Sequence, residues 1–516
     1  MKYKNYRLPG TELLEDHIAE LHEVPQKEID RNIHRIKDTI NIFYKKKIKD
    51  IIAYPGPSVT LYKIIFAGKV NFSAIKEIEK EILMALGMRG VSIVNLPDTI
   101  GIEIANDEPS IVPLKSVLED SSFRESGFEL PVAIGRGESQ KAEVFDLAAA
   151  PHILVAGATQ QGKTVCLNTI ITSLIYSKHP SELKFVLIDP KMVEFTVYAR
   201  LYWHYLAVPM PISDADDDYE QANAIVKNAE WADEILSALI TEMDDRYKMM
   251  AAVSAHDIRE YNDKCKSGST PLPSWHYSMP YIVVIIDEYS DLIASYSRKA
   301  ASPNTAGNIE NSIISLAQKG ASVGIHLIIA TQKPSANVIT KRIKANFPTR
   351  IAFRTMSRAD SMTILDTPGA EKLIGRGDML YHNGSDIKRI QCAYISPWEI
   401  DRITEFIAGQ KDPACRQYCL PIYSKDIAAA DDIEDTIDIN DLDPMFKEAA
   451  ELVVRKHTGA VAILQRQFGV GFIRAGRIMA QLECAGVVGP QVRTRARQVL
   501  VKGIKDLDEI FSKLSI

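Results

Sequence analysis

A glycine-framed loop that ends in Lys-Thr is the first feature that could do chemistry. In HILVAGATQQGKT, Gly157, Gly162, Lys163 and Thr164 have the spacing G-x4-G-K-T, between an apolar β-branched run and a helical pattern. Backbone N–H groups in such a loop bind phosphates; the lysine places a charge on the β and γ phosphates, and the threonine hydroxyl binds Mg²⁺. The sequence therefore predicts a site for ATP and Mg²⁺ formed by Gly157, Ala158, Thr159, Gln160, Gln161, Gly162, Lys163, Thr164 and Val165.

Polar residues that could act on the bound nucleotide follow two further apolar runs. YIVVIIDEY ends in Asp287 and Glu288, and IHLIIATQ ends in Gln332. The carboxyl ends of parallel strands are where open α/β sheets bind ligands. We predict that Asp287 holds Mg²⁺ through water and that Glu288 polarises the attacking water, which indicates hydrolysis. Gln332 is a candidate sensor of the γ-phosphate, with an ordinary turn before a proline as the alternative. With Lys163, these are the predicted catalytic residues.

These side chains need a sheet to position them. Five β-branched runs alternate with helical segments and lie at 152–157, 184–190, 281–289, 325–332 and 349–355. Continuous apolar strands separated by helices predict a parallel sheet that is covered on both faces. We assign residues 131–424 to this α/β module and residues 1–130 to an α+β module, because the latter mixes helical patterns with short strands.

Length and composition place the chain in a broad class. Its 516 residues predict about three domains, each with enough apolar residues for a core. Its apolar runs are far shorter than the about 20 residues of a membrane-spanning helix, and the N-terminus lacks the apolar region of a secretory signal. The six cysteines are unclustered. We expect a cytoplasmic chain with reduced thiols and no direct insertion into a membrane.

The formal net charge of −6 is unevenly distributed. Between Lys425 and Asp443 there are eight acidic residues and one basic residue, so residues 425–442 are predicted to be a solvated linker. Residues 444–505 contain 11 Lys plus Arg and three Glu, a net of +8. We predict a basic domain at 443–505, followed by a tail at 506–516. Its segregated charge makes nucleic acid a plausible partner, although the overall charge alone argues against one.

The basic domain has the pattern of a winged helix-turn-helix. Three helical segments are followed by two short strands, at 444–456, 460–468, 472–485, 487–488 and 498–501. Arg474 and Arg477 lie in the N-terminal half of the third helix, which is the half expected to meet base edges in the major groove. Arg493, Arg495 and Arg497 alternate along the ribbon and are expected to face phosphates. The predicted partner is double-stranded DNA.

At this point the chain resembles the FtsK/SpoIIIE family of double-stranded DNA translocases. The resemblance rests on YRLPGTELLED (6–16), PGPSVTLYKIIFAGKV (55–70), PHILVAGATQQGKTV (151–165), LIDPKMVEF (187–195), YIVVIIDEYSDL (281–292), LAQKGASVGIHLIIATQKPSANVIT (316–340), TILDTPGAEKLIGRGDMLY (363–381) and LQRQFGVGFIRAGRIMAQLECAGVVGP (464–490). It implies a RecA-like core, α and β modules that assemble as a hexameric ring around duplex DNA, and ATP hydrolysis at subunit junctions. It also implies a γ winged helix, a role in chromosome segregation or DNA transfer, and a site-specific recombinase as a partner. By the same resemblance, we expect a chain that begins at the motor, without the family's membrane domain.

The chain departs from the family pattern at several positions. Gln160 and Gln161 replace Gly-Ser in the loop, although its required spacing is kept. Two family arginine positions are Ala321 and Met362, which leaves Arg350, Arg354, Arg358 and Lys319 as substitutes for an arginine that reaches a neighbouring site. On the third helix of the basic domain, the family's Asn and Glu positions are Ile473 and Ala480, whereas Arg477 is kept. We therefore expect a weaker or different preference for DNA sequence.

Two alternative functions remain open at this point. The chain could be the coupling ATPase of a secretion or conjugation system, or a DNA-binding regulator that uses nucleotide as a switch. Other candidates favour structural roles: Cys415 and Cys419 lack a second ligand pair, and His326 lies inside an apolar strand. Asp189 and Lys191 either frame the nucleotide loop or have a purely structural role. The DNA-facing loop of the ring is assigned to 296–309.

Overall fold

The chain forms two units, which we describe separately. The computed structural model describes residues 6–43, 48–68, 84, 91–96, 99–137, 140–209, 224–267, 278–299, 306–410, 418–421, 442–456, 458–459, 461–468, 470, 472–489, 497–501, 503, 506–507 and 510–511. Residues 8–177 with 328–403 form the unit that we call the phosphate-loop unit. Residues 1–7, 178–327 and 404–516 form the second, which we call the carboxylate unit. Nearly all of the acidic linker and most of the C-terminal tail lie outside the described residues.

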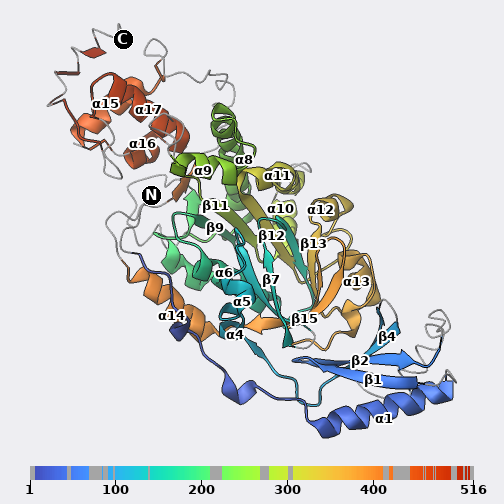
Figure 1. Ribbon diagram of the computed structural model, residues 1–516. Helices are drawn as coiled ribbons and strands as arrows, with labels where there is room; N and C mark the ends of the chain where they lie inside the picture. Colours follow the sequence, from blue (N-terminus) through green and yellow to red (C-terminus); the bar gives the residue numbers. More distant parts are fainter. Residues whose placement is uncertain are drawn as a thin grey trace. The chain divides into compact units, whose positions relative to one another are not determined.

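The phosphate-loop unit begins with a small antiparallel sheet, the N-terminal sheet. Its strands have the order β1-β2-β4-β3 and span Ile48–Pro55, Val59–Phe66, Thr99–Ala105 and Ser92–Leu96. Helix α1 (Gln26–Phe43) covers one face of it (Figure 1). Ile29, Ile36 and Ile40 share one side of α1 and pack on Tyr62 and other apolar residues of the strands. The predicted α+β pattern of this region is therefore confirmed.

A second, mixed sheet forms the core of the phosphate-loop unit. From edge to centre, its strands are β7 (Ala142–Asp146), β6 (Pro131–Arg136), β15 (Ile387–Tyr394), β14 (Asp378–His382), β13 (Thr349–Phe353) and β8 (His152–Ala156), followed by the end of β12 (Ile325–Thr331). β13 and β8 are parallel, as predicted. The pairs β13–β14, β14–β15, β15–β6 and β6–β7 are antiparallel, an extension that the sequence did not indicate.

Helix α6 (Lys163–Ser177) begins directly after the glycine-framed loop and packs on this sheet. Most of its side chains are buried, so it has no strongly polar face. Two hydroxyl groups inside the unit tie it to strands: Thr169 donates to the carbonyl of Ala393 at 2.8 Å, and Ser173 accepts from the amide of Ala133 at 3.2 Å. The loop therefore enters a helix that is fixed in place by both apolar packing and hydrogen bonds.

The carboxylate unit continues the predicted pattern of strands and helices. β11 (Tyr281–Ile286) pairs in parallel with β9 (Leu183–Ile188), and all residues of both strands are buried. The helices of this part are α8 (Ala229–Ala252), α9 (Ile258–Ser267), α10 (Tyr289–Lys299) and α11 (Ala306–Lys319). β10 (Ala207–Pro209) and β16 (Tyr418–Leu420) form a short parallel pair.

A buried ion pair anchors α8 in the carboxylate unit. Arg246, with a side chain 1% exposed, contacts Glu242 at 2.9 Å, the carbonyl of Val323 at 2.8 Å and the hydroxyl of Tyr418 at 3.1 Å. The Tyr418 hydroxyl also donates to Glu242 at 2.6 Å. Every charge in this cluster therefore has a partner, as a buried ion pair requires.

The described part of the C-terminal domain has three helices and two isolated antiparallel β-bridges. The helices α15 (Phe446–Arg455), α16 (Val461–Phe468) and α17 (Phe472–Cys484) lie together (Figure 1). They enclose an apolar cluster that includes Val453, Leu464 and Ile478. Val488 pairs with Val499 in antiparallel fashion after α17. The predicted three-helix pattern with two following strand segments is confirmed. Within the described part of the chain, no helix combines the length and the apolar character needed to cross a bilayer.

Candidate nucleotide site and nucleic-acid interface

The predicted phosphate loop lies between β8 and α6, and its start is fixed to the strands on both sides. The Gly157 amide donates to the Thr331 carbonyl at 3.3 Å, and the Ala158 amide donates to the Arg354 carbonyl at 2.9 Å. Lys163 is the first residue of α6 and is 3% exposed. The loop therefore leads into a helix N-terminus, the arrangement that gathers backbone donors for a phosphate.

The two framing glycines are required by close packing. A Cβ on Gly157 would lie 2.5 Å from the Cβ of Phe353. Gly162 has φ +121, and a Cβ on it would lie 2.9 Å from the backbone of Gly377. Gln160 also has a positive φ, of 62. The loop thus has a strained, tightly packed backbone, a feature typical of ligand-binding loops.

A second loop, residues 374–378, packs against the phosphate loop, and we call it the brace loop. The Gly377 amide donates to the carbonyl of Gln161 at 2.9 Å. Gly375, Arg376 and Gly377 have consecutive positive φ values of 96, 53 and 93. This contact was not predicted from the sequence. Its one local signal is the Gly-Arg-Gly triplet, because glycines flanking a residue often mark an irregular turn.

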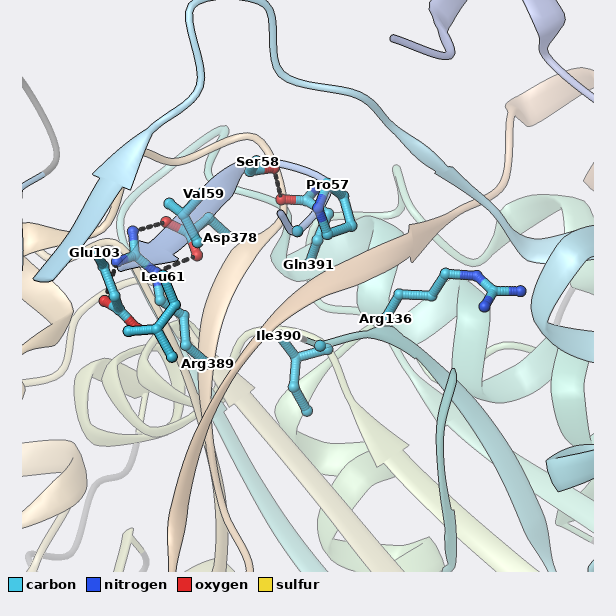
Figure 2. Close-up of a pocket in the computed structure, with 12 residues that line it drawn as sticks. Pro57, Ser58, Val59, Leu61, Glu103, Arg136, Asp378, Arg389, Ile390 and Gln391 are labelled. Carbon is cyan, nitrogen blue, oxygen red and sulfur yellow. Dashed lines mark hydrogen bonds and ion pairs between the residues drawn. The ribbon is translucent and has the colours of Figure 1, made fainter. Parts of the chain in front are cut away.

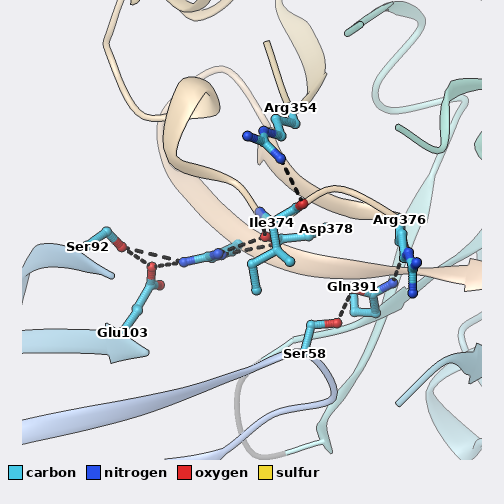
Figure 3. A network of polar contacts seen from close by, with 9 residues as sticks. Ser58, Ser92, Glu103, Arg354, Ile374, Arg376, Asp378 and Gln391 are labelled. Carbon is cyan, nitrogen blue, oxygen red and sulfur yellow. Dashed lines mark hydrogen bonds and ion pairs between the residues drawn. The ribbon is translucent and has the colours of Figure 1, made fainter. Parts of the chain in front are cut away.

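Arg354 lies beside both loops. Its backbone carbonyl accepts from the amide of Ala158, and its side chain donates to the carbonyl of Ile374 at 3.4 Å. Figure 3 shows it next to Ile374, above the brace loop. Arg354 therefore has a local role at the nucleotide loop. Arg350, another candidate substitute, is held by Asp366 at 2.6 Å and by three backbone carbonyls.

The predicted sensor Gln332 contacts the phosphate loop directly. Its side-chain oxygen accepts from the hydroxyl of Thr159 at 2.8 Å, and both residues belong to the phosphate-loop unit. Gln161 donates to the backbone carbonyl of Thr159 at 3.1 Å. A change in the phosphate loop would therefore move Thr159, the hydrogen-bond partner of Gln332. This contact favours the sensor role over the alternative of an ordinary turn.

Asp287 and Glu288 follow β11 in the carboxylate unit, as predicted. Each is 1% exposed. The Glu288 carboxylate accepts from the hydroxyl of Ser290 at 2.7 Å and lies 3.6 Å from the ammonium of Lys191. Burial opposes the charge of Lys191, but Glu288, Asp291 and Asp287 outweigh it and raise the pKa of this lysine. Lys191 therefore stays charged beside the candidate base.

Asp189 organises the loop that carries Lys191. Its carboxylate is fully buried and accepts five backbone N–H groups. One oxygen accepts from residues 191 and 192 at 3.1 and 3.0 Å, and the other from residues 193, 194 and 195 at 3.0, 2.9 and 3.1 Å. Of the two roles left open by the sequence, Asp189 has a structural one, and it orients Lys191 toward Glu288.

In the C-terminal domain, both candidate DNA-binding arginines of α17 contact one aspartate. Asp443 accepts from Arg474 at 2.9 and 3.0 Å and from Arg477 at 3.0 Å. The arginine side chains are 23% and 30% exposed. Burial opposes the charge of Asp443, but Arg474, the amide of Met445 and Arg477 outweigh it, so the pKa of this carboxyl lies below its ordinary value. Arg474 and Arg477 are thus fixed at the edge of the helix.

The expectation that Arg497 faces a phosphate is wrong for this structure. Arg497 is 4% exposed, its side chain contacts Glu483 at 2.8 Å, and its backbone pairs with Gly459. The alternation along the ribbon indicated an outward side, but the pairing with Gly459 turns this residue into the domain. Arg493 and Arg495 lie outside the described residues, so their predicted role stays a prediction.

The remaining candidates have structural surroundings or are incompletely described. His326 is 1% exposed, and its ring stacks on Tyr281 at 5.8 Å between centroids. Cys415 and part of the segment 296–309 lie outside the described residues. Among the residues that are described, no group of three His, Cys, Asp or Glu side chains could hold a metal ion.

Three family models match successive parts of the chain. They are the FtsK alpha domain at residues 8–106, the FtsK/SpoIIIE family at 113–336 and the FtsK gamma domain at 440–502. Among solved structures, the pCW3 conjugation coupling protein TcpA with ATPγS covers 73% of this chain and 99% of its own, with 22% identity and a TM-score of 0.48. That similarity does not discriminate between the functions considered above.

Curated relatives are similar along nearly the whole chain. A DNA translocase FtsK of Chlorobaculum tepidum is 38% identical over 99% of this chain and 61% of its own length. A DNA translocase FtsK of Haemophilus influenzae is 36% identical over 96% of this chain and 92% of its own length. The chain spans about 60% of the length of most of the curated relatives that it matches. The order of the three domains and the extent of this identity show that the chain belongs to the FtsK/SpoIIIE family.

Proposed function

We propose that the chain is an ATP-hydrolysing motor that moves along double-stranded DNA. The observation that carries this proposal is the phosphate loop, whose strained backbone is packed on the brace loop and leads into the N-terminus of α6. The relatives named DNA translocase support the choice of DNA as the substrate. The C-terminal domain, which matches the FtsK gamma domain, supports it further.

The residues have distinct roles in this proposal. Backbone N–H groups of residues 157–165 hold the phosphates of ATP, and Lys163 places its charge on them. Thr164 and Asp287 hold Mg²⁺, which neutralises charge on the phosphates when it is bound. Glu288 polarises the attacking water, and Lys191 keeps this carboxylate oriented. Gln332 follows the state of the loop through Thr159.

The proposed partners follow from the same family. Arg474 and Arg477 are the residues of α17 that we assign to duplex DNA, since DNA phosphates can compete with Asp443 for their guanidinium groups. We propose a homo-oligomeric, hexameric ring that acts in the cytoplasm, where chromosomal DNA and ATP are both present. We also propose that the chain acts in chromosome partition at cell division and that it cooperates with a site-specific recombinase.

Two assays on the full chain test the motor. The ATPase rate is measured with and without long duplex DNA, and displacement of a third strand from a triplex is measured in parallel. Stimulated hydrolysis together with displacement is expected, and Lys163→Ala should abolish both. Strong DNA binding without stimulated hydrolysis would contradict the motor and favour the nucleotide-switched regulator. Mass measurement in solution with ATP tests the ring, and a monomer at micromolar concentration with DNA would contradict it.

The sequence preference of the C-terminal domain has a separate test. We propose a weaker or different preference than the family has, because the Glu position on α17 is Ala480, which is buried. Binding of the full chain is compared on random duplexes and on duplexes that carry the family consensus. Because one good base contact is worth about 1–3 kcal/mol, a preference of about tenfold or more for the consensus would contradict the proposal.

A further inference from the structure

The brace loop is tied to the N-terminal sheet by side chains, although the two are far apart in sequence. Figure 3 shows this network between strands β2, β3 and β4 on one side and the start of β14 on the other. All of its residues belong to the phosphate-loop unit. Two separate chains of contacts run through it, and each ends on the backbone of the brace loop.

The first chain of contacts is ionic. Arg389 of β15 contacts the Asp378 carboxylate through two bonds of 3.0 and 2.7 Å and also pairs with Glu103 of β4. Ser92 of β3 lies 3.4 Å from the same guanidinium and donates to Glu103. The Asp378 carboxylate accepts from the amide of Ile374 at 2.8 Å. Glu103 is thus connected to the first residue of the brace loop through one arginine and one aspartate.

The second chain of contacts is neutral. Ser58, just before β2, donates its hydroxyl to the side-chain oxygen of Gln391. The amide group of Gln391 then donates to the carbonyl of Arg376 at 2.9 Å, and the backbone amide of Cys392 donates to the carbonyl of Gly377 at 2.8 Å. The middle of the brace loop, where φ is positive, is therefore held by β15 and indirectly by Ser58.

The ionic contacts are buried, so each charged side chain must keep its partner. The side chains of Arg389, Glu103 and Asp378 are 6%, 6% and 2% exposed. Burial opposes the charge of Arg389, but Asp378 and Glu103 outweigh it and raise the pKa of this arginine. A small pocket beside the network is lined by both the N-terminal sheet and β15 (Figure 2). A buried ion pair adds little net stability, but the loss of one partner leaves an uncompensated charge that must move.

The brace loop in turn contacts the phosphate loop at two points. The Gly377 amide donates to the carbonyl of Gln161, and the backbone of Gly377 fills the space where a Cβ on Gly162 would be. A displacement of Gly377 would therefore alter the two residues that precede Lys163. The path from Glu103 to the phosphate loop passes through the side chains of Arg389 and Asp378 and one short segment of backbone.

We propose that Glu103 and Ser58 of the N-terminal sheet are positioning residues for the nucleotide site. They fix the brace loop, and the brace loop fixes Gln161 and Gly162 in the conformation that binds phosphate. The inference rests on the proposed nucleotide binding. Because linkage is reciprocal, nucleotide binding must also stabilise the contacts of Glu103 and Ser58, so that the N-terminal sheet responds to the nucleotide.

The experiment uses the full chain with Glu103→Gln, which keeps the shape of the side chain and removes its charge. Asp107→Asn is the matched control: Asp107 follows β4 and pairs with Arg31 at 2.8 Å, but both side chains are exposed. The dissociation constant for ATPγS with Mg²⁺ is measured by titration calorimetry. Hydrogen exchange of the brace loop is followed by mass spectrometry, with and without ATPγS.

We expect the dissociation constant of Glu103→Gln to rise about tenfold, in the range of 5–150-fold that coupled sites show. Exchange in the brace loop should accelerate, and ATPγS should protect it less than in the wild-type chain. Asp107→Asn should change neither quantity by more than about twofold, because an exposed ion pair contributes little. Ser58→Ala should shift both in the same direction by a smaller factor, since it removes one neutral hydrogen bond.

Several results would overturn the inference. If wild-type and Glu103→Gln chains bind ATPγS equally and their brace loops exchange equally, Glu103 does not position the site. If Glu103→Gln fails to fold, Ser58→Ala decides, and equal affinity and exchange in that variant would also overturn it. Failure of the wild-type chain to bind ATPγS would instead overturn the proposed function itself, so the two failures are distinguishable.

Discussion

Replacing Asp189 by Asn should destabilise the carboxylate unit strongly, despite the small change in size. The carboxylate accepts five backbone N–H groups, two on one oxygen and three on the other. An asparagine has one oxygen, so it can keep the set of three and must turn its NH₂ group toward the other two donors. Hydrogen bonds to a charged group are worth about 1.5–3 kcal/mol each, so the loss of two gives about 3 kcal/mol at the lower end.

Urea unfolding at pH 7, followed by tryptophan fluorescence, measures this loss, and hydrogen exchange of residues 191–195 localises it. Asp257→Asn is the control, because Asp257 caps α9 with a single bond of 2.8 Å to the amide of Glu260, and asparagine caps a helix about as well as aspartate. A free energy of unfolding within about 0.5 kcal/mol of the wild type for Asp189→Asn would refute the reasoning, since ordinary surface changes reach that size. So would unchanged protection of residues 191–195.

Three further predictions concern other side chains. Gln332→Ala should lower the rate of ATP hydrolysis about tenfold or more but change the dissociation constant for ATPγS less than about threefold. The reason is that a sensor of the γ-phosphate acts on the reaction rather than on binding. An equal loss in rate and in affinity would contradict a sensor role. Asp443 has a lowered pKa, so its stabilising contribution is complete above the unfolded value of about 3.9 and is lost as the pH falls through the lower folded value. Urea unfolding between pH 2 and 7 should therefore show a shallower loss of stability in acid for Asp443→Asn than for the wild type, and identical profiles would argue against the ion pairs with Arg474 and Arg477. Arg246→Met should cost about 3–5 kcal/mol because it leaves a buried carboxylate unpaired, and a loss below about 1 kcal/mol in urea unfolding would contradict this.

The sequence predicted the elements around the nucleotide site because their signals are local. β8, β11 and β13 are short apolar runs, and each begins at its predicted residue and ends one to three residues before its predicted end. The spacing of Gly157 and Gly162, between an apolar run and a helical pattern, is sufficient to predict the loop between β8 and α6. These features depend on residue type along a few positions, which is what hydrophobic periodicity and glycine placement report.

Contacts between distant segments could not be predicted in this way. The brace loop reaches the phosphate loop from more than 200 residues away, and its sequence signal is confined to Gly375 and Gly377. The strand β14 is short and partly polar, so periodicity alone does not place it in a sheet. Arg497 shows the same limit, because alternation gives a side of the ribbon but cannot show that Gly459 pairs there and buries it.

The structure narrows the question of which basic residue could replace the missing family arginines. Arg350 is fixed by Asp366 and backbone carbonyls, and Arg354 contacts the brace loop, so both have roles within their own unit. Arg358 is exposed at the start of α13 (Arg358–Leu365), and Met362, at a family arginine position, is 42% exposed four residues later. Residues four apart share a face of a helix, so the side chains at positions 358 and 362 project from the same face of α13. Its long side chain can span much of the one-turn rise of about 5.4 Å between the two positions, so we propose Arg358, rather than Arg350 or Arg354, as the substitute.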